Sequence, residues 1–187
     1  RTGGLYAVTL DEGDELLSVL KTDGGTSIIA ATEKGYAIRF DENDVRCVGR
    51  QARGVRAVRL TAGDRVVGAA VIPQDGEKRL LTITAKGYGK RTPCSEYREQ
   101  ARNGKGIRAM MVTDKTGPVV GIKVVDGTED LLLVTQAGIL IRTPVDSIRT
   151  AGRATQGVIV MRFKEEGDHV ISLALTDHEE GSAEAEE

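Results

Sequence analysis

Aromatic residues are scarce in this sequence, and long apolar runs are missing from it. Only 3% of its 187 residues are aromatic, with two Phe, four Tyr and no Trp. This composition disfavours binding sites built on stacked bases or on aromatic cages. No apolar stretch approaches the ~18 residues that a membrane span needs. The sequence therefore predicts no membrane span, and we expect any recognition to be largely electrostatic.

Cysteines are also few. Cys47 and Cys94 are too few for a disulfide framework, and neither lies in a spacing typical of a metal site. We therefore expect a reducing, cytoplasmic compartment and no bound metal. The sequence begins Arg1-Thr2-Gly3-Gly4, with neither Met nor a charged and apolar leader. We expect no signal peptide and interpret the sequence as a fragment.

The formal net charge of -2 hides an asymmetry along the chain. Residues 164–187 carry one basic and nine acidic side chains, a net of -8, so residues 1–163 carry +6. Residues 177–187 hold six of these acids and no aliphatic side chain larger than Ala. They have nothing to bury, which predicts a disordered acidic tail. Such a tail either solubilises the chain or mimics a polyanion and inhibits binding.

An internal repeat of about 51 residues dominates the sequence, and such a period decides the fold class. It is marked by glycines, most of them followed by short apolar runs. Two glycine columns keep this period: Gly4, Gly54, Gly106 and Gly157, and Gly35, Gly87 and Gly138. The units cover about 11–60, 61–113 and 114–163, with partial units at 1–10 and 164–176.

Within each unit, short runs rich in Val, Ile, Leu and Thr alternate with turns, without a helical period. In the second unit they predict strands at 66–72, 80–84, 88–92 and 107–112. Four strands in each repeat of this length are typical of a propeller blade. The predicted fold is all-β, a propeller-like array of about three complete four-stranded blades plus partial end units, spanning residues 1–176. A closed ring, an open arc and a strand-swapped dimer all remain open.

Basic residues recur in the same register as the glycines, mostly between the third and fourth predicted strands. A single surface arginine usually only keeps a β protein soluble, but these residues repeat in both position and sign. A row of such clusters suits a regularly charged ligand, and duplex DNA is the obvious one. Basic density falls along the chain, so we expect the first two blades to dominate. The predicted DNA-binding residues are Arg39, Arg46, Arg50, Arg53, Arg56, Lys86, Lys90, Arg91, Arg98, Arg102, Lys105, Arg108, Arg142, Arg149 and Arg153.

Taken together, several motifs resemble the C-terminal domain of the DNA gyrase A protein over essentially the whole length. They are Gly54-Val55-Arg56-Ala57-Val58 with its repeats, the stretch 152–159, Leu140-Ile141-Arg142-Thr143 and the acidic tail. The resemblance implies a β-pinwheel, in which neighbouring blades exchange a strand and a basic rim wraps DNA without reading its sequence. The family domain has six blades, so this chain looks like its C-terminal half.

The same resemblance implies a non-catalytic part of an ATP-hydrolysing type IIA topoisomerase that introduces negative supercoils. No GxxxxGK[ST] motif occurs in the sequence, and none of its tyrosines follows an arginine as the DNA-cleaving tyrosine of the family does. We therefore expect no catalytic residue and no cofactor in this chain, with ATP and magnesium needed only in the full enzyme. The implied partners are double-stranded DNA, the rest of the gyrase A chain and the gyrase B protein, in the bacterial cytoplasm at the nucleoid.

The family's hallmark box, Gln-Arg-Arg-Gly-Gly-Lys-Gly, is present only as a degenerate copy. Residues 100–106 match it at Gln100, Arg102, Gly104, Lys105 and Gly106. The related C-terminal domain of topoisomerase IV, which shares the blades without full wrapping, is therefore a close alternative. A propeller that docks proteins is the third interpretation, and it would require exposed aromatic or Met anchors.

Overall fold

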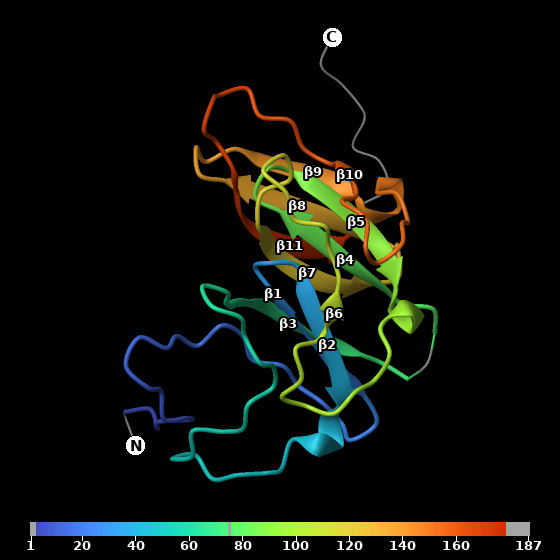
Figure 1. The fold of residues 1–187 in the computed structure, drawn as a ribbon. Coiled ribbons are helices and arrows are strands. Elements are labelled where there is room, and N and C mark those ends of the chain that lie inside the picture. The colour runs from blue at the N-terminus through green and yellow to red at the C-terminus, as the bar shows by residue number, and fades with distance from the viewer. Residues whose placement is uncertain (1–2, 75, 179–187) are drawn as a thin grey trace.

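Three antiparallel sheets follow one another along the chain and stack face against face. The computed structural model describes residues 3–74 and 76–178. Figure 1 shows the first sheet at the lower end and the other two above it, and buried clusters join the second sheet to both the first and the third. This arrangement confirms the all-β array of blades that the repeat predicts. The helices of the described residues are three short 3-10 turns, and none of them has the length and apolar character of a membrane span.

The strands fall into the sheets in a repeated order. Across the first sheet lie β3 (Val66–Ile72), β1 (Ser27–Thr32), β2 (Tyr36–Asp41) and β6 (Ile107–Arg108). Across the second lie β7 (Val119–Val125), β4 (Arg79–Thr84), β5 (Tyr88–Pro93) and β10 (Val158–Ile159). The third contains β11 (Val170–Asp177), β8 (Glu129–Thr135) and β9 (Leu140–Pro144). A 3-10 turn follows each hairpin: η1 (Glu42–Asp44), η2 (Cys94–Glu96) and η3 (Val145–Ser147).

Each of the first two blades receives its outer strand from a later repeat. The hairpin of β1 and β2 pairs on one side with β3 and on the other with β6, where Arg108 lies opposite Tyr36. In the same way β10 pairs with β5. The exchanged strands are two residues long, so the predicted fourth strand over 107–112 is wrong beyond Arg108. The backbone leaves the sheet there, and the Met111 N–H donates to the carbonyl of Thr155 instead.

The blades are also shifted in phase from the predicted sequence units. The first blade combines β1 and β2 from the first unit with β3 and β6 from the second. The shift arises because the long segment 42–65 leaves the hairpin before the chain returns to add β3 beside β1. In this phase each blade contains a hairpin and the strand that follows its long connecting segment, and the first two blades also receive a fourth strand, β6 or β10, from the connecting segment of the next blade.

The two ends of the stack are less complete than its middle. Among the described residues, no strand pairs with the outer edge of β9. At the other end, residues 16–22 correspond in the repeat to β3 but form no strand, and Leu16 and Val19 are 63% and 82% exposed. β11 continues to Asp177, and residues 179–187 of the predicted tail lie outside the described residues.

Apolar side chains from neighbouring sheets form the core between blades. Ile29 of the first blade packs in one buried cluster with Leu80 and Ile122 of the second. Leu81 packs in a second cluster with Leu131 and Leu133 of the third blade. Complete burial of a Leu or Ile side chain stabilises a fold by about 1.5–3 kcal/mol. The blades therefore support one another, and the segments carried on their edges have defined positions.

Candidate nucleic-acid interface

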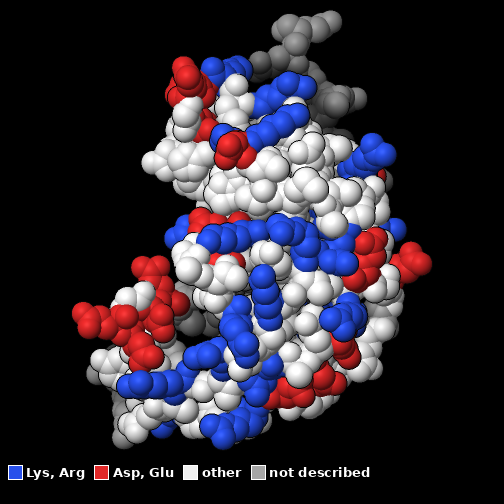
Figure 2. Space-filling model, viewed as in Figure 1, with Lys and Arg blue, Asp and Glu red and all other residues white. Residues whose placement is uncertain are grey.

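Most of the basic columns lie on three long segments that connect the second strand of each hairpin to the third strand of its blade. We call these segments the rim loops: residues 42–65, 94–118 and 145–169. Each begins with a 3-10 turn, and the later two contain the exchanged strands β6 and β10. Figure 2 shows Lys and Arg side chains gathered in a band over the lower and middle parts of one face, with acidic groups at its margins.

One column of arginines points into solvent on all three rim loops. Arg46, Arg98 and Arg149 each stand two residues after a 3-10 turn, and all three are exposed. None of their guanidinium groups makes a hydrogen bond or an ion pair within the described residues. We call them the exposed arginines. Their guanidinium groups are available for charge-assisted hydrogen bonds to phosphate oxygens.

A second predicted column is engaged inside the protein. Arg39 donates from Nη1 to the carbonyls of Cys94 and Tyr97 at 3.2 and 3.3 Å, on the rim loop of the next blade. Arg91 repeats this contact one blade later, donating to the carbonyls of Asp146 and Ile148 at 2.6 Å. Burial lowers the pKa of Arg91. The two side chains thus connect the first and second hairpins to the rim loop of the following blade.

Arg142, the third member of that column, turns back onto its own sheet. Its Nε lies 2.7 Å from the Asp130 carboxylate, and its Nη2 donates to the carbonyl of Asp177. His178 also contacts Asp130, and His178 and Arg142 together hold the pKa of this carboxyl below its ordinary value. Polar contacts of Arg142 and His178 with Asp130, and of Arg142 with the Asp177 carbonyl, therefore hold the end of β11 against β8 and β9.

A third column bridges neighbouring rim loops. Arg102 donates to the carbonyls of Asp44 and Arg56 at 2.8 and 2.9 Å. Arg153 donates to the carbonyl of Arg108 at 2.7 Å. Both side chains belong to half-buried residues. The sequence predicts that both contact DNA, but in the structure their donors are directed at backbone carbonyls.

Lys90 requires a correction to the predicted site. The residue is completely buried, and its Nζ donates to the carbonyls of Gly152, Arg153 and Thr155 at 2.8, 2.6 and 2.9 Å. Burial lowers its pKa to about 8. An ammonium group enclosed in this way cannot reach a phosphate. Lys90 therefore belongs to the support of the third rim loop and not to the DNA surface.

The remaining predicted residues are exposed, and several are held by neighbours. Arg53 forms an ion pair with Asp11 at 3.0 Å between two well-exposed side chains, and such pairs contribute little to stability. Lys86 donates from Nζ to the carbonyl of Asp114. The predicted residues not yet described, all of them exposed, are Arg50, Arg53, Arg56, Lys86, Lys105 and Arg108.

An aromatic residue that the sequence did not single out organises part of this surface. The Tyr36 ring carries Lys105 Nζ at 5.1 Å from its centroid and Arg108 Cζ at 4.6 Å, within the range of cation–π attraction. Arg108 also donates to the Tyr36 hydroxyl at 2.9 Å. Arg59 and Arg162 were missed as well, although both are exposed and occupy the same repeat position. Their shared register was the signal that could have found them.

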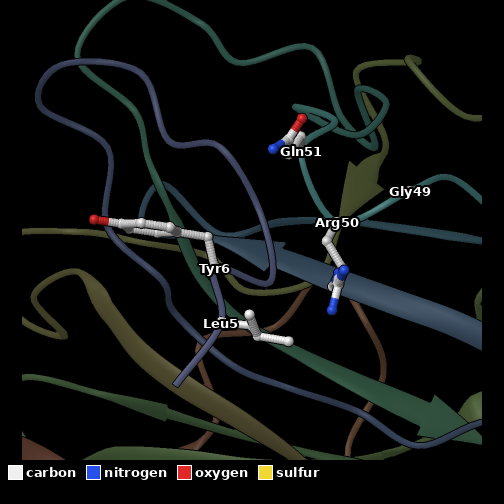
Figure 3. A pocket seen from close by; sticks show the side chains of 5 residues that line it. All are labelled: Leu5, Tyr6, Gly49, Arg50 and Gln51. Atoms are coloured by element: carbon white, nitrogen blue, oxygen red, sulfur yellow. The ribbon is translucent and has the colours of Figure 1, made fainter. Parts of the chain in front are cut away.

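A cavity lies between the first rim loop and the N-terminal residues. Leu5, Tyr6, Gly49, Arg50 and Gln51 line a cavity of about 530 Å³. Figure 3 shows the Arg50 side chain directed toward Leu5, while the Tyr6 ring extends away from it. In the repeat, Arg50 corresponds to Arg102. No group of three metal-binding side chains is found in the part of the chain that the structure describes.

Comparison with known proteins decides the family. The family described as "DNA gyrase C-terminal domain, beta-propeller" matches residues 26–73, 78–126 and 129–177. The chain belongs to this family. The three matched segments follow the phase of the structure, because each contains the hairpin and the later edge strand of one blade: β1, β2 and β3, then β4, β5 and β7, then β8, β9 and β11.

Relatives support the same assignment. The chain is 42% identical over 186 residues to the DNA gyrase A protein of Haloquadratum walsbyi, covering 100% of this chain and 22% of that protein. It is 42% identical over 173 residues to the DNA gyrase A protein of Salmonella typhimurium, covering 92% and 19%. The chain therefore spans about a fifth of the length of these curated relatives.

Solved structures share the fold of this family member. A crystal structure of the C-terminal domain of DNA topoisomerase IV superimposes with a TM-score of 0.85 at 26% identity, covering 91% of this chain and 53% of that one. A structure of the DNA gyrase A C-terminal domain gives a TM-score of 0.81 at 27% identity, covering 92% and 58%. Both relationships extend across all three blades of the chain.

Proposed function

We propose that this chain is a DNA-binding and DNA-wrapping domain of a gyrase-type, type IIA topoisomerase. It contacts phosphates through the rim loops without reading base sequence, and it assists ATP-dependent negative supercoiling by the full enzyme. Catalysis, ATP and magnesium belong to other parts of that enzyme, with the rest of the gyrase A chain and gyrase B as partners in the bacterial cytoplasm. The names of the relatives support this proposal.

The observation that carries the proposal is the repetition of the exposed arginines. Arg46, Arg98 and Arg149 occupy one position on three successive loops, and their side chains have no competing partner in the described residues. Each phosphate neutralised by such a side chain releases counterions, which favours binding at low salt. Bending 20–30 base pairs costs about 1–6 kcal/mol, a cost that several contacts of this kind can offset.

A second candidate is the topoisomerase IV type of domain, which bends DNA without full wrapping. Two observations favour it: the solved topoisomerase IV domain superimposes at least as well as the gyrase domain, and the box at 100–106 is degenerate. Ala101 stands where the box has an arginine, so one rim charge is absent. The two candidates share phosphate binding and differ in the geometry imposed on DNA.

A salt titration tests the shared part. The affinity for a random-sequence duplex is measured at several KCl concentrations, and we expect a steep log–log slope and little sequence preference. Replacing Arg46, Arg98 and Arg149 together by Gln should lower the slope by about three units. Lys123→Gln, on strand β7, is the matched control for the loss of a positive charge. Absence of binding at low salt would instead favour a protein-docking propeller.

A topological footprint separates the two candidates. Closed circular DNA is relaxed while the protein is bound, and the linking change is read after the protein is removed. A captured change of constant sign supports gyrase-type wrapping. Bending without a captured change supports the topoisomerase IV type.

A further inference from the structure

We propose that Arg102 and Arg153 are positioning residues that fix the step from one blade to the next. On this proposal they set the curvature of the DNA path and do not themselves contact DNA. The inference rests on the proposed function of the rim loops.

The geometry of Arg102 is that of a bridge between two loops. Its Nε donates to the carbonyl of Asp44 at 2.8 Å, and its Nη1 donates to the carbonyl of Arg56 at 2.9 Å. Asp44 ends turn η1 and Arg56 lies twelve residues later, so the two acceptors stand on either side of the exposed Arg46. One planar guanidinium therefore holds the second rim loop against two separate points of the first.

The same tie recurs at the next junction. Arg153 donates from Nη1 to the carbonyl of Arg108 at 2.7 Å, and its backbone N–H donates to Glu96 Oε2 at 2.9 Å. Arg108 and Glu96 correspond in the repeat to Arg56 and Asp44. A contact repeated at corresponding positions of two junctions is a property of the blade step and not of one loop.

Each junction is tied from both sides. Arg39 and Arg91 reach forward from a hairpin to the next rim loop, while Arg102 and Arg153 reach back from that loop to the preceding one. The opposed ties restrict sliding of one loop along the other. The separation of Arg46 from Arg98 then follows from the ties, because these exposed side chains lie on the loops that are tied.

The ties depend on the shape of arginine as well as on its charge. The guanidinium fork directs donors toward two acceptors at fixed angles, whereas a lysine ammonium is a point charge on a flexible stem. Arg102→Lys keeps the charge and loses the two-point bridge. Arg102→Gln loses both the charge and the bridge. Arg98→Gln, four residues earlier on the same loop, removes an exposed charge and leaves the bridge in place.

The test compares these variants for DNA affinity and DNA shape. Salt slopes of binding are measured with a duplex of about 40 base pairs, whose end-to-end distance is followed by fluorescence energy transfer at saturating protein. Arg98→Gln should lower the salt slope by about one unit and leave the transfer efficiency at saturation near the wild-type value. Arg102→Lys and Arg102→Gln should keep the salt slope within half a unit of the wild-type value. Both should clearly lower the transfer efficiency, because the ends of a less curved duplex lie farther apart.

Two results would overturn the proposal: a slope loss in Arg102→Gln equal to that of Arg98→Gln, or wild-type transfer efficiency in both Arg102 variants.

A measurement without DNA keeps the proposal separate from the proposed function. Spin labels on the exposed Cys47 and on Ser95→Cys report the loop separation, while the buried Cys94 stays unlabelled. The distance distribution should broaden in both Arg102 variants while the circular dichroism spectrum keeps its β signature. An unchanged distribution refutes the tie even if the wild type binds no duplex.

Discussion

The same arginine repeat serves two different roles, and the direction of the side chain decides which. Arg46 and its repeats are exposed, whereas the side chain of Arg39 is only 20% exposed and donates to backbone carbonyls. Arginine suits both positions, because its planar fork matches a phosphate as well as a pair of carbonyl oxygens. Sequence register identifies such columns but does not reveal where the donors point.

Tyr36 provides a test of how the basic surface is organised. Tyr36→Leu keeps an apolar side chain but removes the ring beneath Lys105 and Arg108. We expect a two- to fivefold loss of DNA affinity, since an exposed cation–π contact contributes about 0.5–1 kcal/mol. The salt slope should not change, because both cations remain. Tyr36→Phe loses only the hydroxyl contact to Arg108, so its DNA affinity should lie between those of the wild type and Tyr36→Leu. A salt slope lower in Tyr36→Leu than in the wild type would contradict the prediction, because it would mean that a phosphate contact has been lost.

Lys90 gives the protein a dependence on pH. Its pKa falls from the ordinary 10.5 to about 8 because burial disfavours the charged form. Between these values the unfolded chain binds more protons than the folded one, so this group makes the fold more stable as pH rises from about 8 to 10.5. The slope is at most about 1.4 kcal/mol per pH unit.

Lys90→Ile is the matched variant, because Ile38 and Ile141 occupy the same repeat position. Urea unfolding at several pH values should show the wild type gaining stability over Lys90→Ile between pH 8 and 10. A difference that shrinks over this range would mean that the carbonyls of Gly152, Arg153 and Thr155 favour the ammonium more than burial opposes it.

Asn103 explains how the degenerate box keeps its backbone. It has a φ of 65°, the one positive value outside glycine in the described residues. The family box has glycine at this position, and Asn tolerates the left-handed region better than most residues. The substitution therefore preserves the turn before β6, whereas Ala101 in place of arginine removes a charge. Residues 100–106 therefore keep the backbone turn of the family box but carry one positive charge fewer.

At the level of elements, the exchanged strand determines what the hairpin turns tolerate. Gly87 and Gly138 have φ of 75° and 82° at equivalent turns. A Cβ on Gly87 would overlap the Met161 carbonyl beside the exchanged strand β10, whereas one on Gly138 would meet nothing within 4 Å. Both positions have a positive φ that would strain an alanine, and they differ in the space available to its Cβ.

Alanine at these two turns should therefore have unequal effects. Gly138→Ala should cost about 1–2 kcal/mol, the strain of a left-handed residue with a Cβ. Gly87→Ala should cost clearly more, because β10 must also move away from β5. Urea unfolding measures both costs, and equal losses would show that the exchanged strand contributes little to the second blade.

The strands were predictable from sequence because apolar runs and glycine turns are local signals. Strand β3 agrees with its predicted range, and β5 differs from its prediction by one residue. Strand exchange between blades was expected only from the resemblance to the family. The sequence repeat did not indicate at which strand each blade begins. Pairing partners separated by about 70 residues, such as Tyr36 and Arg108, leave no periodic trace in either segment. The burial of Lys90 was hidden for the same reason, since its acceptors lie about 60 residues away.

At the scale of the whole molecule, the stack presents its rim loops as a series. Interlocked cores between blades hold the loops, and the exposed arginines recur at every step. A ligand that follows the series meets similar groups in turn. The array thus converts one sequence repeat into a repeated charge pattern, which suits a polyphosphate better than a compact partner.

Single replacements along this series should be additive but not equal. Arg46→Gln, Arg98→Gln and Arg149→Gln should each lower the salt slope by about one unit, because each removes one phosphate contact. The loss of affinity at fixed salt should be greatest on the first two loops, since exposed basic side chains number six on the first rim loop, four on the second and three on the third. Neighbouring cations there hold the DNA close enough for each contact to form. The measurement is a salt titration of every single variant and of the triple variant. If Arg149→Gln alone abolished binding, the DNA path would instead be centred on the third blade.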